Sequence, residues 1–166
     1  LLGTIWAETV DRFYKGVDEA ENTKLALSSW AEHTEGWVPD KAKERLTKAL
    51  ESWTSQYYQN FSPDDGTRNG SELWLEDDKF MARLDGLSSD KVVHEVKSTS
   101  RSPMMSEQLW KVQNSLQVKL YCVLSQATAH CVEFAFKDPP HQIYRGPIEP
   151  VTEQQRKKWA QELVAL

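Results

Sequence analysis

The sequence contains few cysteines and no long apolar segment. Cys122 and Cys131 are its only cysteines, and two are too few for the multi-disulfide framework of a small secreted domain. We therefore interpret both as free, buried thiols in a reducing compartment. No apolar run approaches the roughly 20 residues that a membrane helix needs, and no signal peptide is visible. These absences predict an intracellular protein that does not enter a membrane.

The chain also lacks an excess of positive charge. Its formal net charge is −5, which argues against a surface coated with lysine and arginine for non-specific binding of nucleic acid. A local basic groove is compatible with this value. A cluster of catalytic carboxylates would itself add negative charge, and a bound metal ion would offset that charge.

The first half of the chain changes from helical to strand-like patterning. Its 166 residues suffice for one domain with its own core. Helical spacing in the N-terminal third predicts two helices, the second opening at Pro39. Short alternating segments then predict a three-stranded antiparallel meander over 71–76, 79–87 and 91–98.

The second half returns to helix and then alternates. A helix from Ser106 is predicted by one apolar stripe that consists of Leu109, Val112, Leu116, Leu120 and Val123. A strand over 128–136, a short strand over 141–144 and a helix over 152–166 follow, with Thr152 as N-cap. We expect one α/β domain over 1–166, with a central mixed β-sheet that contains an antiparallel meander and is flanked by helices.

The strand predicted over 91–98 carries the residues with the clearest chemical potential. Side chains alternate between the two faces of a strand, so Val93, Glu95 and Lys97 share one face. An acid-x-lysine pattern of this kind is also common on solvated strands, where it forms ion pairs. The triplet alone therefore leaves both a catalytic and a structural interpretation open.

A second carboxylate lies upstream on the preceding strand. If the hairpin is centred near Ser89, Asp85 faces Val93 and lies diagonal to Glu95, at about 7–8 Å. Two carboxylates could then converge on one hard divalent cation, Mg²⁺ or Mn²⁺. Such an ion polarises a phosphoryl oxygen and lowers the pKa of a bound water, so the pattern indicates hydrolysis of a phosphate ester.

The helix after this hairpin adds two polar groups. Gln117 and Tyr121 are four residues apart, so they occupy one helix face. They could hydrogen-bond a phosphate or a water at the scissile bond. The alternative is structural, with Tyr121 packed at the edge of the apolar stripe and Gln117 solvated.

Together these residues resemble one known nuclease family. The order Asp85, then Glu95-Val96-Lys97, then Gln117 and Tyr121 is similar to the RecB-like branch of the PD-(D/E)xK superfamily. Further similarity lies in Glu72, which resembles the acidic residue that often opens the preceding strand. It extends to residues 3–8, which resemble the G-T-x-x-H-E start of the family's first helix.

The resemblance implies a restriction-endonuclease-like core and a role for each matching residue. Asp85 and Glu95 would be metal ligands, with the Val96 carbonyl as a third, and Lys97 would assist the attacking water. Gln117 and Tyr121 would position DNA or the phosphate. The family cuts DNA, and the RecB-like branch favours exonuclease action on DNA ends or single strands.

This sequence departs from the family at three points. Ala7 occupies the position of a histidine ligand, which has been lost naturally or replaced. Without this histidine, metal binding and activity would be weaker. No proline precedes Asp85, a variation that the superfamily tolerates. The iron–sulfur variants need four cysteines, so no iron–sulfur cluster is expected.

Several other side chains are candidates for DNA contact. Arg101, Lys111 and Lys119 follow the catalytic strand and could contact phosphates, although each also suits an ordinary charged surface. Trp74 and Trp110 could stack on a displaced base, but we expect core packing for each.

Two rivals to the nuclease differ from it in class. One is a catalytically impaired nuclease-fold domain that binds nucleic acid or protein, which the alanine at position 7 makes credible. The other is a structural domain in which Asp85, Glu95 and Lys97 form only an ion-pair network. The presence of all three residues together favours the enzyme.

Overall fold

The computed structural model describes residues 1–64, 73–100 and 105–166. Three helices come first, where the sequence predicted two: α1 (Leu2–Tyr14), α2 (Glu19–Thr34) and α3 (Asp40–Asn60). Gly16 has a left-handed φ of 85° just after α1, which turns the chain away from the helix. Asp18 then caps α2, because its side chain accepts a hydrogen bond from the Glu21 amide at 2.9 Å.

The main sheet is mixed, as predicted. Its strand order is β3-β4-β5-β6, and β7 also pairs with β5. Strands β4 and β5 are parallel and the other pairs are antiparallel. The bounds are β3 (Gly86–Leu87), β4 (Val92–Thr99), β5 (Ala129–Phe136), β6 (Ile143–Arg145) and β7 (Glu149–Pro150). Every residue of β5 is buried, as expected of a central strand covered on both faces.

The predicted three-stranded meander is divided between two sheets. Strands β1 (Leu73–Glu76) and β2 (Met81–Leu84) form a separate two-stranded antiparallel sheet. The strand predicted over 79–87 therefore breaks at Asp85. The carboxylate of Asp85 accepts a hydrogen bond from the Val96 amide at 2.9 Å. A side-chain oxygen thus satisfies the strand amide at this position, where a continuous ladder would use a backbone carbonyl.

The predicted register of the β3–β4 hairpin is wrong by two residues. Leu87 pairs with Val93 and Gly86 with His94, so the hairpin is centred at Asp90 and not near Ser89. The Ser88 side chain fixes this longer turn by accepting a hydrogen bond from the Val92 amide at 3.1 Å. Continuing the pairing sets Asp85 next to Glu95 rather than diagonal to it.

The helix predicted from Ser106 is two helices, α4 (Met105–Gln113) and α5 (Leu116–Ser125). Ser115 has an extended backbone and its side chain accepts from the Val118 amide, so a new helix starts there. Leu116, expected in the apolar stripe, is 52% exposed, whereas Val118 is fully buried. The closing helix α6 (Glu153–Val164) has the predicted Thr152 N-cap, within a complete capping box.

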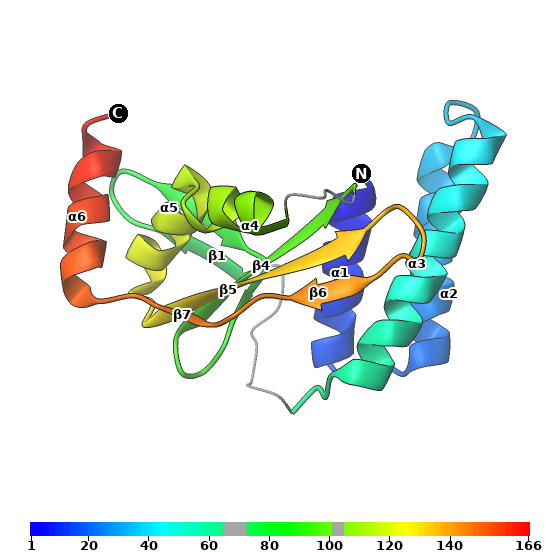
Figure 1. The fold of residues 1–166 in the computed structure, drawn as a ribbon, viewed down its shortest axis with the longest axis horizontal. Coiled ribbons are helices and arrows are strands. Elements are labelled where there is room, and N and C mark those ends of the chain that lie inside the picture. Colours follow the sequence, from blue (N-terminus) through cyan, green and yellow to red (C-terminus); the bar gives the residue numbers. More distant parts are fainter. Residues whose placement is uncertain (65–72, 101–104) are drawn as a thin grey trace.

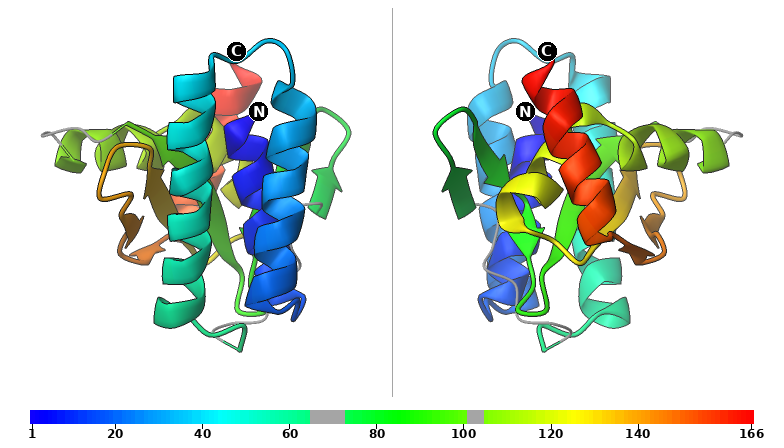
Figure 2. Two further views of the ribbon diagram at one scale, coloured as in Figure 1. Left: turned by 90° about the vertical axis from the view of Figure 1, so that its right-hand side faces the viewer. Right: turned by 90° about the vertical axis from the view of Figure 1, so that its left-hand side faces the viewer.

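Helices cover both faces of the main sheet (Figure 1). On one face, α1 and α3 pack on the sheet and α2 packs on these two helices (Figure 2). On the other face, α4 and α5 pack on β5 and β4, and α6 packs on α5. Among the residues described, no helix is long and apolar enough to cross a membrane.

Candidate active site

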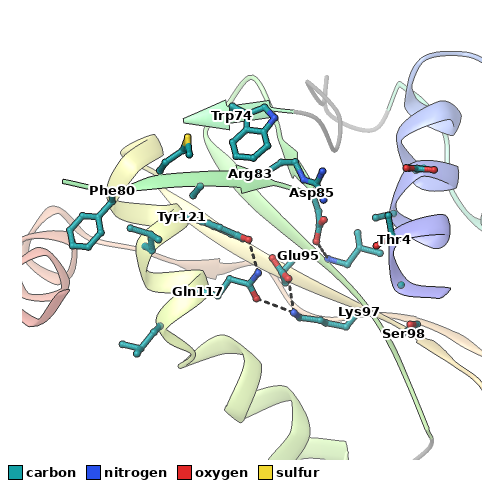
Figure 3. A pocket seen from close by; sticks show the side chains of 18 of the residues that line it. Thr4, Trp74, Phe80, Arg83, Asp85, Glu95, Lys97, Ser98, Gln117 and Tyr121 are labelled. Carbon is teal, nitrogen blue, oxygen red and sulfur yellow. Dashed lines mark hydrogen bonds and ion pairs between the residues drawn. The ribbon is translucent and has the colours of Figure 1, made fainter. Parts of the chain in front are cut away.

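A cavity of about 1120 Å³ opens where the two sheets and two helices meet. Its wall is formed by α1, the β1–β2 hairpin, β4, α5 and the C-terminal end of α6. The residues singled out from the sequence as catalytic all line it (Figure 3): Asp85, Glu95, Lys97, Gln117 and Tyr121. The segment before β3, strand β4 and helix α5 thus bring all five predicted catalytic residues to one cavity.

Two carboxylates lie at the centre of this cavity. Glu95 is only 2% exposed. Its Oε1 forms an ion pair with the Lys97 ammonium at 3.0 Å, while no hydrogen-bond donor among the described residues reaches its buried Oε2. Asp85 uses one oxygen to accept from Val96. Glu95 thus keeps one buried oxygen atom that the described part of the protein does not satisfy, which is costly for a buried polar atom.

The electrostatics of the two carboxylates reflect their burial and proximity. Burial, and next the negative charge of Asp85, raise the pKa of Glu95 to about 7, against the opposing effect of Lys97. Burial also raises the pKa of Asp85, although the hydrogen bond from Val96 and the charge of Lys97 act against this. A positive ion between the two groups would remove this penalty.

A chain of polar contacts links the lysine to the helix α5. The Lys97 ammonium donates to Gln117 Oε1 at 3.0 Å, and Gln117 Nε2 donates to the Tyr121 hydroxyl at 2.6 Å. The spacing of four residues on α5 makes the second contact possible. Gln117 therefore fixes the lysine from the helix side, as Figure 3 shows.

The Tyr121 hydroxyl is a proton donor and not a base in this setting. Burial, and next the charge of Glu95, raise its pKa to about 12. Because its oxygen already accepts from Gln117, its proton is available for an acceptor in the cavity.

Helix α1 contributes one polar face to the same cavity. Gly3, Thr4, Ala7 and Glu8 line it, while the opposite face of α1 is buried in the core. The helix lies close to β4, since a Cβ added at Gly3 would stand 3.5 Å from Ser98 Oγ. Ala7 thus faces the cavity that holds the carboxylates, which is where the resemblance puts a histidine.

The donor set suits a hard divalent cation but is small. Carboxylate oxygens are what Mg²⁺ and Mn²⁺ prefer, and Asp85 and Glu95 supply them beside Val96, which also lines the cavity. Within 1–64, 73–100 and 105–166, no cluster of three or more His, Cys, Asp or Glu side chains gathers at one point. An ion here would depend on two carboxylates, a carbonyl and water.

Of the other residues singled out from the sequence as candidates for substrate contact, Glu72, Arg101, Lys111 and Lys119, only the two lysines are among the described residues. Glu72 and Arg101 lie outside the described residues. Lys111 pairs with Glu107 at 3.1 Å on the surface of α4, and Lys119 pairs with Glu162 at 3.2 Å. The two lysines are absent from the cavity lining, so their contact with phosphate stays a prediction.

Sequence reasoning gave no role to two side chains that line the cavity, Glu8 and Arg83, and named Trp74, which also lines it, only as the less favoured candidate for base stacking. Core packing was expected for Trp74 and Trp110, and this is wrong, because they are 56% and 63% exposed. The alternation of β1 and β2 was the signal available for Trp74 and Arg83, since it sets them on one face. Glu8 was quoted within the helix-one motif and given no role.

Comparison with known proteins shows a similarity of fold but identifies no family for this chain. No family model matches the chain, and no curated protein sequence matches it. The crystal structure of a phage related exonuclease from Haemophilus somnus 129PT matches 99% of this chain and 89% of that chain, with 10% identity and a TM-score of 0.50.

A second crystal structure, of SSO0001, covers 86% of this chain and 85% of that chain, with 16% identity and a TM-score of 0.34. At 10% identity the first similarity concerns fold alone, and this chain therefore has a mixed α/β core of the nuclease-like kind.

Proposed function

We propose that this chain is a divalent-metal-dependent deoxyribonuclease that hydrolyses phosphodiester bonds at DNA ends or in single strands. The observation that carries the proposal is the convergence of Asp85, Glu95 and Lys97 in one cavity. Its volume of about 1120 Å³ is that of a generous ligand pocket. The fold similarity to a phage related exonuclease supports the same class of reaction.

Each side chain would have a distinct part. Asp85 and Glu95 would hold Mg²⁺ or Mn²⁺, with the Val96 carbonyl beside them. Such an ion polarises a phosphoryl oxygen and lowers the pKa of water. Lys97 would orient the attacking water and stabilise the charge that develops on the phosphate. Gln117 would keep the lysine in place.

The neutral Tyr121 hydroxyl would donate a hydrogen bond to a phosphate oxygen. The pKa of Tyr121 lies far above neutral pH. The hydroxyl therefore stays protonated and uncharged, and it can donate a hydrogen bond to an anion. Its partner Gln117 restricts its rotation. Preorganised donors of this kind contribute most in a water-poor site.

The direct test is cleavage of end-labelled single- and double-stranded DNA with Mg²⁺, with Mn²⁺ and with chelator. We expect cleavage with either metal and none with chelator. Lys97→Ala should lower the rate about a hundredfold or more, the usual cost of removing one preorganised charge-stabilising group, while DNA binding falls far less. Lys48→Ala on the exposed surface of α3 is the matched control.

Absence of cleavage with both metals would contradict the enzyme. Equal rates for the parent protein and Lys97→Ala would contradict the assigned role of the lysine.

A second candidate function is a nuclease-fold module that binds nucleic acid or protein without cutting. The alanine at position 7 and the lack of a third acidic or histidine ligand among the described residues favour it. DNA binding by the parent protein without cleavage in any metal would support this module.

A further inference from the structure

The exposed indole of Trp74 is the feature of the cavity that catalysis by the carboxylates does not explain. It lies on β1, is 56% exposed and lines the cavity. Tryptophan side chains usually bury most of their large surface. An indole left open beside a polar site therefore suggests a ligand with an apolar face.

The β1–β2 hairpin presents this indole by its strand geometry. Trp74 and Arg83 are directly opposite in the antiparallel register, so they share a face. The neighbouring positions Leu75 and Ala82 point the other way, into the cluster built around α5. The Arg83 guanidinium carbon lies 5.8 Å from the centre of the Trp74 ring, within the range of a cation–π contact.

The hairpin also sets the indole close to the carboxylates. Arg83 is two residues before Asp85, and a strand rises about 3.3 Å per residue, so the separation along the strand is roughly 7 Å. Trp74 is one strand further out. Figure 3 shows Trp74 and Arg83 at the rim of the cavity, above Asp85.

The described lining of the cavity offers few cationic contacts for the phosphates of a nucleic acid. Its described lining contains two basic side chains, Arg83 and Lys97, against three acidic ones, Glu8, Asp85 and Glu95. Lys97 is already engaged by Glu95. Because affinity for a nucleic-acid backbone grows with the number of phosphates that are neutralised, contacts with the bases would add substantially to the affinity of this weakly basic lining.

From these observations we infer that Trp74 is a stacking platform for an unpaired nucleobase of single-stranded DNA, adjacent to the nucleotide that is cleaved. An aromatic ring stacks on any base and so gives affinity without sequence preference. Bases inside a duplex already stack on one another and offer no free face. The inference deepens the proposed nuclease function and rests on it for the position of the scissile bond.

Binding of a fluorescently labelled oligo-dT strand in chelator, followed by anisotropy, tests the platform without cleavage. Trp74→Ala should weaken binding about tenfold or more, since stacking accounts for that much per base. Trp74→Phe should keep most of the affinity. Trp37→Ala is the matched control, because Trp37 is 65% exposed and does not line the cavity.

A single abasic nucleotide moved along the strand identifies the stacked base. With the parent protein, an abasic nucleotide at one position should weaken binding about as much as Trp74→Ala does. With Trp74→Ala, the abasic nucleotide at that position should weaken binding no further. Binding should also depend weakly on salt, with a log–log slope between about −0.7 and −1.4 for one or two phosphate contacts. A steep salt dependence, or equal binding by the parent and Trp74→Ala, would overturn the inference.

Cleavage of the same oligonucleotides with Mn²⁺ separates this inference from the proposed function. If the parent protein cleaves and Trp74→Ala binds equally well, the platform is wrong and the nuclease stands. If single-stranded binding depends on Trp74 but no metal supports cleavage, the nuclease is wrong and the subsite stands.

Discussion

At the scale of single residues, Asp85 gives the sharpest test of metal binding. An ion that binds only the folded state stabilises it by mass action. At one hundred times its dissociation constant, Mn²⁺ should raise the Tm of the parent protein by about 5–10 °C. Asp85→Asn should abolish this shift, because the amide lacks the negative charge. Its oxygen can still accept from Val96, so the fold is kept.

Thermal unfolding with and without Mn²⁺ measures the effect. Asp78→Asn is the control, because Asp78 is an exposed carboxylate in the turn after β1 and its loss should leave the shift intact. An equal shift in Asp85→Asn and the parent protein would remove Asp85 from the metal site.

Ala7 is the second residue on which metal binding depends. It faces the carboxylate cavity from α1, so Ala7→His would bring a nitrogen ligand toward the ion. Imidazole suits Mn²⁺ better than Mg²⁺, and we expect tighter Mn²⁺ binding by calorimetry together with faster cleavage of single-stranded DNA. Ala7→Gln adds similar bulk without a ring nitrogen and should give neither gain. If both variants behave like the parent protein, α1 does not reach the ion.

At the scale of elements, a buried ion pair joins helices and strands. Arg145 on β6 donates through Nε to Glu133 on β5 at 3.0 Å, and Tyr57 on α3 donates to the same carboxylate at 2.8 Å. The arginine also donates to Tyr14 on α1 at 2.7 Å. Four elements therefore meet at one buried carboxylate, since Glu133 is only 2% exposed.

Removal of this arginine should be strongly destabilising. Arg145→Gln leaves Glu133 buried without its cation, and breaking a buried pair in this way costs about 3–5 kcal/mol. Urea unfolding measures the loss. Lys111→Gln breaks an exposed pair with Glu107 on one helix and should cost less than about 1 kcal/mol. Similar losses for the two variants would show that the buried pair does not hold the elements together.

At the scale of the whole molecule, stability should depend on pH through Glu95. Its pKa is about 7 in the folded protein, above the ordinary value of 4.5, so the folded state holds this proton more tightly than the unfolded chain. The contribution of this proton to the free energy of unfolding is fully present below about pH 4.5, and it is lost as the pH rises through about 7. In chelator, the free energy of unfolding should therefore contain a component that falls across this window.

Urea titrations at several pH values, on the parent protein and on Glu95→Gln, isolate this component. The difference between the two proteins should change across pH 4.5–7 and be flat above it. Saturating Mn²⁺ should suppress the fall in the parent protein, because the cation favours the ionised carboxylate. A pH-independent difference in chelator would mean that Glu95 titrates as in the unfolded chain.

The sequence by itself determined the features that depend on local periodicity. Alternation along β4 places Glu95 and Lys97 on one face of the strand. Helical spacing places Gln117 and Tyr121 on one face of α5. The Thr152 cap and the strand ending at Phe136 were likewise predictable, because caps and β-branched runs act over a few residues. The mixed α/β fold followed from the order of these elements.

Tertiary structure alone decided the features that involve long-range competition. The Val96 amide donates its hydrogen bond to a side-chain oxygen of Asp85, and the predicted strand ends there. The turn at Ser88 shifts the β3–β4 register, so that Asp85 and Glu95 become neighbours. Trp74 is exposed because the inner face of its hairpin is filled by residues that contact α5. Periodicity assigns a residue to one of two faces, whereas only the packing of distant elements decides which face is buried and which carboxylates meet.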